Sequence, residues 1–180
     1  PAVVNFNNTK SYTINGPFGI AAGAVNKNGA GTVTISSPNT YSGGTTINAG
    51  RVVTQNTSAL GSGAVVLNAG VLAPAQAVNV QSLNWTGGNV ALTPASGDVI
   101  HATNAFTNGG GGGAYQIGFA GLAKTTYTLT TFASTNFSLG QFSATIDNPN
   151  PNVVYQHQFL LNPSSVQLVI LGAAATGSTL

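Results

Sequence analysis

Ionisable side chains are almost absent from this sequence. Lys, Arg, Asp and Glu together make up 3 % of its 180 residues, against about a quarter in an average soluble protein. Because a nucleic-acid backbone is usually bound by a cluster of Lys and Arg, this composition argues against nucleic acid as a partner. A low net charge also removes one barrier to self-association. The charged residues are spread along the chain, at Lys10, Lys27, Arg51, Lys124, Asp98 and Asp147.

Cysteine and methionine are both absent. Without Cys, the chain has no disulfide bonds and no thiolate metal ligands. Without Met, it does not begin at its own initiator residue, so we expect a processed chain or a part of a longer one. The longest apolar run, Val166–Ala175, is interrupted by Gln167 and Gly172 and is too short to cross a bilayer. The sequence therefore predicts no membrane span.

Few residues are available for catalysis or for metal binding. Glycoside hydrolysis usually needs two carboxyl groups within about 10 Å of each other, and the two acids, Asp98 and Asp147, both lie in turn sequences. The histidines, His101 and His157, lack the cysteines and acids that usually complete a metal site. The chain contains the Ser, His and Asp residues that a catalytic triad requires, but no nucleophile-elbow motif supports such a triad. We therefore predict that the chain is not an enzyme and has no catalytic residue, metal or cofactor.

The sequence repeats itself at a period of twenty residues, since the tripeptide Asn48-Ala49-Gly50 returns as Asn68-Ala69-Gly70. This period corresponds to one coil of a β-solenoid, in which short strands are joined by tight bends. One coil cannot bury its apolar face alone, so coils must stack on one another. Gly suits bends in which φ is positive and another backbone lies close. We expect the Asn residues before these glycines to bond the backbone of the adjacent coil.

Short alternating segments predict the strands of such a solenoid. They are separated by Gly, Asn, Ser and Pro, which favour turns, and no segment has the pattern of a helix. The clearest strands are expected at residues 32–36, 45–48, 51–54, 64–67 and 70–73. Further strands are expected at 18–25, 78–83, 89–92, 125–132, 141–146, 153–161 and 165–171.

Changes in composition divide the chain into four parts. Residues 1–27 are expected to form N-terminal strands that cap the stack or pair with another subunit, and residues 28–104 to form the solenoid. The glycine run Gly109–Gly113 is expected to be a mobile loop. Residues 105–171 are rich in aromatics and are expected to close the far end of the stack, because an open end would template aggregation. Residues 172–180 are expected to be a tail.

The segment around the first copy of the repeat resembles a known family. Its three parts are Gly29–Ile35 (GAGTVTI), Asn39–Gly50 (NTYSGGTTINAG) and Ala59–Gly63 (ALGSG). Together they are similar to the autotransporter-associated β-strand repeat, also called the passenger-associated transport repeat. The resemblance implies an all-β fold, a right-handed parallel β-helix, on a protein that is secreted or displayed on a bacterial surface. It implies no particular activity.

We therefore predict a non-enzymatic, secreted structural protein that forms an extracellular filament or matrix. Copies of the chain would associate head to tail, by stacking of coils or by strand donation. The contact is expected in the terminal strands, at Val3, Val4, Phe6, Tyr12, Ile14, Val166, Leu168 and Ile170. The alternative is a surface-displayed adhesin or passenger stalk of an autotransporter-like protein, which would touch extracellular glycans through Trp85 or Tyr41.

Overall fold

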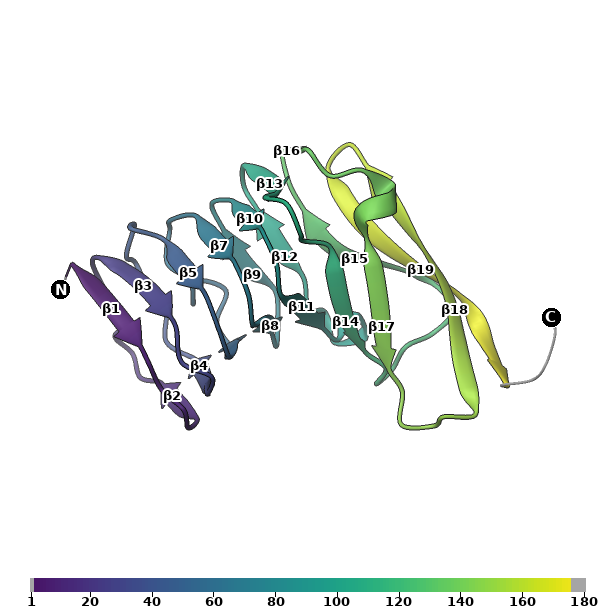
Figure 1. Ribbon diagram of the computed structural model, residues 1–180, viewed down its shortest axis with the longest axis horizontal. Helices are drawn as coiled ribbons and strands as arrows, with labels where there is room; N and C mark the ends of the chain where they lie inside the picture. Colours follow the sequence, from purple (N-terminus) through teal and green to yellow (C-terminus); the bar gives the residue numbers. More distant parts are fainter. Residues whose placement is uncertain (1, 176–180) are drawn as a thin grey trace.

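The chain winds into coils that stack along one axis, with the N-terminal strands at one end and a long hairpin at the other (Figure 1). A computed structural model describes residues 2–175. Apart from two short 3-10 helices, η1 (Pro94–Ser96) and η2 (Leu139–Gln141), the regular structure in this range is β-strand. The prediction of an all-β solenoid is confirmed.

Three sheets run along the stack. Sheets A and B each gain one strand as the chain completes a coil, whereas sheet C begins only at β9 and ends in the antiparallel strands β19 and β18. Sheet A contains β1 (Val3–Phe6), β3 (Ala24–Lys27), β5 (Thr45–Ile47), β7 (Val65–Leu67), β10 (Leu83–Trp85), β13 (Ala105–Asn108) and β16 (Ser134–Thr135). Sheet B contains β2 (Tyr12–Ile14), β4 (Thr32–Ile35), β6 (Arg51–Thr54), β8 (Val71–Pro74), β11 (Asn89–Leu92), β14 (Ala114–Gly118) and β17 (Ser143–Asp147). Sheet C contains β9 (Val78–Val80), β12 (Ile100–Ala102), β15 (Thr126–Thr131), β19 (Ser165–Ala175) and β18 (Val153–Asn162).

The twenty-residue period sets the register of the parallel strands. In sheet A, Lys27 pairs with Ile47, Ile47 with Leu67, and Leu67 with Trp85. Successive side chains of a strand point to opposite faces, so these residues form one column inside the stack. Burial alternates accordingly along most of the short strands. The core is thus a set of inward columns, each with one residue from every coil.

A ladder of side-chain amides follows the bends between sheets A and B. Asn28 donates to Asn7 (3.1 Å), Asn48 to Asn28 (2.8 Å) and Asn68 to Asn48 (2.8 Å), and the Thr86 hydroxyl donates to Asn68 (2.7 Å). We expected these residues to bond backbone groups. They bond one another instead, because parallel in-register stacking places identical side chains about 4.8 Å apart.

The solenoid continues past residue 104 without a break, because sheets A and B extend to β16 and β17. Phe106 pairs in register with Leu83, and Tyr115 with Val90, so aromatic side chains replace aliphatic ones in the same inward columns. The change in composition near residue 105 is therefore a change of core side chains within one fold. The glycine run forms the bend between β13 and β14.

An antiparallel hairpin of β18 and β19 completes the far end, with β19 also antiparallel to β15. Phe159 of β18 lies 5.7 Å from Phe142, measured between ring centroids, and so covers the last part of the core. Strand β19 reaches Ala175, which pairs with Val153, so the first four residues of the expected tail belong to this strand. Residues 176–180 lie outside the described range.

Two predicted strands differ from the structure. Residues 78–83 were expected to form one strand, but they divide between β9, which ends at Val80, and β10, which begins at Leu83 in a different sheet. The other strand is shorter than expected. Residues 18–25 were expected to be extended, but β3 begins only at Ala24. The segment before it is held by single contacts, such as the bond from the Ile20 N–H to the Asn39 side chain (2.7 Å). Its glycines account for this, since Gly23 has a φ of +91°, which no strand accommodates.

Candidate functional site

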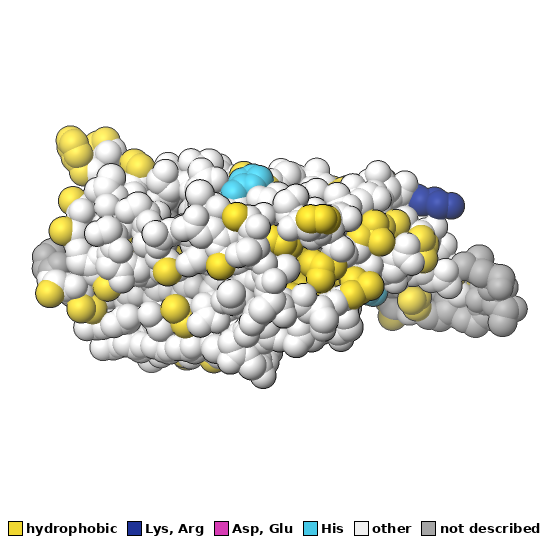
Figure 2. Space-filling model, turned by 90° about the horizontal axis from the view of Figure 1, so that it is seen from above, with side chains coloured by type: hydrophobic (Ala, Val, Ile, Leu, Met, Phe, Trp, Pro, Cys, Tyr) yellow, Lys and Arg dark blue, Asp and Glu magenta, His cyan; other side chains and the backbone are white. Residues whose placement is uncertain are grey.

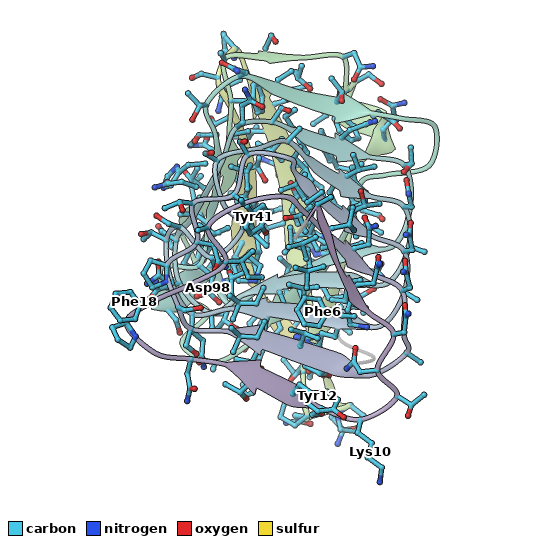
Figure 3. The ribbon with its side chains drawn as sticks, turned by 90° about the vertical axis from the view of Figure 1, so that its left-hand side faces the viewer. Phe6, Lys10, Tyr12, Phe18, Tyr41 and Asp98 are labelled. Carbon is cyan, nitrogen blue, oxygen red and sulfur yellow. The ribbon has the colours of Figure 1, made fainter. Side chains whose placement is uncertain are left out.

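The first coil leaves one end of the core open. Its inward residues are in register with buried residues of the second coil, yet they are themselves only half-buried or exposed. Tyr12 is 58 % exposed, because β2 is the edge strand of its sheet and none of residues 2–175 covers its outer side. Figure 3 looks onto this end and shows Phe6 within the stack and Tyr12 at its margin. These inward residues are Val4, Phe6, Tyr12 and Ile14.

Free strand edges accompany these apolar side chains. Strand β1 pairs only with β3, and β2 only with β4, so each has unpaired N–H and C=O groups on its outer edge. Phe18 projects from the side of the same coil and is 88 % exposed (Figure 3). We call this surface the open end; its apolar residues are Val3, Val4, Phe6, Tyr12, Ile14 and Phe18.

The C-terminal half of the expected contact requires a correction. Val166, Leu168 and Ile170 are buried, because β19 lies between β15 and β18 and turns these side chains to the core. They are not available to another molecule. The last aromatics of the core, Phe137 and Phe142, are also buried, so this end is covered by the chain itself. Contact through Val3, Val4, Phe6, Tyr12 and Ile14 stays a prediction.

The two residues expected to touch glycans are buried as well. Trp85 points into the core, where its ring lies 5.2 Å from that of Tyr115 and 6.2 Å from that of Phe106. The hydroxyl of Tyr41 lies 2.6 Å from that of Thr45, and burial raises the pKa of Tyr41 to about 12. Neither ring is free to stack on a sugar, so this prediction is wrong for both residues.

Lys27 is a buried cation that sequence reasoning did not single out. Its side chain occupies an inward column between Phe6 and Ile47, and its ammonium donates to the carbonyls of Gly29 and Ala49 (3.3 Å to the latter). Burial lowers the pKa of Lys27. The alternation of β3 places Lys27 on the same face as Val25, and that alternation was the available signal.

The acids and histidines occupy separate structural settings. Asp98 is 4 % exposed, and its Oδ2 accepts from the Thr93 N–H (2.8 Å), whereas Asp147 is exposed at the end of β17. His101 Nδ1 lies 2.8 Å from the Thr131 hydroxyl, and His157 Nδ1 lies 3.2 Å from a backbone carbonyl. Within residues 2–175, no group of three or more His, Asp or Glu is arranged to hold a metal ion.

Burial of Asp98 predicts a pH-dependent stability. Burial raises the pKa of Asp98 above its ordinary value of 3.8, with the bond from Thr93 opposing the shift. The folded chain therefore holds this proton more tightly than the unfolded chain, and the resulting stability is lost as pH rises through the folded pKa. Relative to wild type, Asp98→Asn should gain stability as pH rises from about 4 to about 7. Urea unfolding of the variant and of wild type at both pH values measures this change. If the stability of the variant relative to wild type stays constant or falls as pH rises, the prediction is wrong.

The comparisons with known proteins identify one segment. Residues 25–53, from β3 to β6, match the family model of the passenger-associated-transport-repeat. Neither the curated proteins nor the solved structures include a match to the chain. Of the described residues, none forms a helix long and apolar enough to cross a membrane. Residues 25–53 of this β-solenoid are thus similar to the passenger-associated transport repeat, a family associated with autotransporter passenger domains.

Proposed function

We propose that the chain is a non-enzymatic structural protein of the bacterial surface or extracellular space, which associates through its open end. The transport repeat and the solenoid fold support a passenger-like role. One observation supports association through the open end. The inward residues of the first coil are uncovered, whereas those at the other end are buried.

Association at the open end would stabilise the exposed core. Apolar surface removed from water contributes about 25 cal/mol per Å², and Tyr12 and Phe18 are largely in water. The free edges of β1 and β2 can accept a further strand on each sheet. Electrostatic repulsion is small, because charge is sparse; the face in Figure 2 is mostly uncharged, with Lys or Arg near one end.

A closed pair is the form of association that we favour. When two open ends meet, each subunit uses the same surface, so the contact is complete with two subunits. A head-to-tail filament would instead require β1 to meet β16 and β2 to meet β17, which are the far edge strands of sheets A and B. The pair is favoured because Phe137 and Phe142 are already covered at that far end.

Sedimentation velocity of the pure protein tests the proposal. We expect monomer to convert to dimer as concentration rises, and Tyr12→Ser to weaken the dimer by about tenfold or more, since a large apolar side chain leaves the contact. The matched control is Leu160→Ser, which changes an exposed apolar residue on β18 and should leave association unchanged. Monomer at every concentration would contradict the proposal and favour the passenger stalk. An equal loss of dimer affinity in Tyr12→Ser and Leu160→Ser would also contradict the proposal.

A further inference from the structure

A hollow lies over the outer face of sheet B near the covered end. It has a volume of about 490 Å³ and is lined by residues of β11, β14 and β17. These three strands are neighbours in sheet B (Figure 1). Small residues make this space, because Ala91 and Ala114 face outward here and Gly118 has no side chain. A Cβ on Gly118 would lie 2.5 Å from the Thr93 hydroxyl oxygen, so this position accepts no larger residue without movement.

Several polar side chains of the hollow have no hydrogen-bond partner among residues 2–175. Elsewhere on the solenoid, exposed amides bond one another between coils, as in the ladder from Asn7 to Thr86. Within residues 2–175, the side chains of Asn89, Gln116, Thr145 and Asp147 make no hydrogen bond. Register places Gln116 beside Thr145, and Gly118 beside Asp147. Two amides, a hydroxyl and a carboxylate are thus gathered on adjacent strands.

The rim of the hollow is held in place by Asn148. Its side-chain amide donates to the carbonyls of Asn150 (2.9 Å) and Val153 (2.8 Å), and its oxygen accepts from the Asn150 N–H (3.1 Å). These bonds tie the end of β17 to the start of β18. A fixed rim beside open donors and acceptors limits the conformational entropy that a ligand must remove.

The chemistry of the lining selects a class of ligand. The volume suits a small molecule or one or two sugar units. Amides both donate and accept, and a carboxylate accepts from two hydroxyls, so the hollow complements a polyhydroxylated surface. No Lys or Arg lines it, and Asp147 would repel an anion. We propose that this hollow binds a neutral saccharide, through Asn89, Gln116, Thr145 and Asp147.

Backbone amide chemical shifts during titration test this proposal. The probes are the neutral disaccharides lactose, maltose and N,N′-diacetylchitobiose, with a sulfated heparin disaccharide as the anionic comparison. We expect at least one neutral probe to shift amides of β11, β14 and β17. The dissociation constant should be in the millimolar range, because the aromatic ring in the lining, that of Tyr115, is buried and cannot stack on a sugar. The sulfated probe should leave these amides unchanged.

Two variants make the test specific. The double variant Gln116→Ala, Thr145→Ala should weaken binding by about tenfold, because two hydrogen bonds are lost. The matched control is Thr34→Ala, which removes an outward hydroxyl from the same sheet away from the hollow. Absence of shifts with every neutral probe overturns the proposal, as does binding that survives in the double variant. Sedimentation of these variants should match wild type, so failure here is distinct from failure of association at the open end.

Discussion

Replacing Gly70 with Ala is expected to destabilise the solenoid by more than about 4 kcal/mol. Gly70 has a φ of +75°, and a Cβ there would lie 2.5 Å from the carbonyl oxygen of Gly50 in the preceding coil. That oxygen already accepts from the Val71 N–H at 2.8 Å, so it cannot move aside without loss of a pairing between coils. Urea unfolding followed by circular dichroism measures the change.

A matched control separates the clash from the backbone strain. Gly97 has a similar φ of +86°, but nothing lies within 4 Å of the position of its Cβ. Gly97→Ala should therefore show only the strain of the left-handed conformation, about 1–2 kcal/mol. Equal losses in the two variants would contradict the stacking that we describe, because the neighbouring coil would then contribute nothing at Gly70.

Replacing Trp85 with Ala is expected to cost about 3–5 kcal/mol of stability. Its fully buried ring lies within 6.3 Å of three other aromatic rings, measured between ring centroids. Its removal leaves a cavity at the point where aliphatic columns give way to aromatic ones. Trp85→Phe should lose less, because most of the apolar volume is kept.

The comparison residue is Phe18, an aromatic that is almost fully in water. Phe18→Ala should change the stability of the monomer by less than about 0.5 kcal/mol. Since Trp85 is the single tryptophan, its fluorescence follows unfolding of the Phe18 variant, while circular dichroism follows the variants of Trp85 itself. A Trp85→Ala variant as stable as Phe18→Ala would show that the aromatic cluster does not hold this end together.

The repeat made the architecture predictable from the sequence. The strands expected at 45–48 and 64–67 are β5 and β7, and they pair in register because the twenty-residue period returns each residue to the same place in the next coil. A single coil has no stable alternative to stacking. The period therefore contains information about tertiary structure that a lone strand pattern lacks.

Burial was harder to predict than the strands themselves. Alternation separates two faces, but it does not show which face is inward or whether another segment covers it. Trp85 was expected to touch sugars, yet it lies in the same column as Leu67. Lys27 was read as one of a few scattered charges, yet it lies in this column three coils before Trp85. Aligning the strands before and after the repeat in the same register would have identified both Lys27 and Trp85 as inward residues.

The candidate surfaces depend on features that no local pattern contains. The inward residues of β1 and β2 are exposed because these strands lie at the edges of sheets A and B, and Val166 is buried because β19 inserts between two other strands. The hollow arises where small residues of β11 and β14 lie beside one another. Each of these is a relation between segments far apart in the chain. The sequence could therefore supply the residues of such a surface but not their exposure.

Electron microscopy of the pure protein with a gold label at its N terminus shows which ends of the subunits meet. We expect short rods joined in pairs, with the label at the junction and the β18–β19 hairpins at the outer tips. Single rods at high protein concentration, or pairs that carry the label at their outer tips, would contradict this expectation.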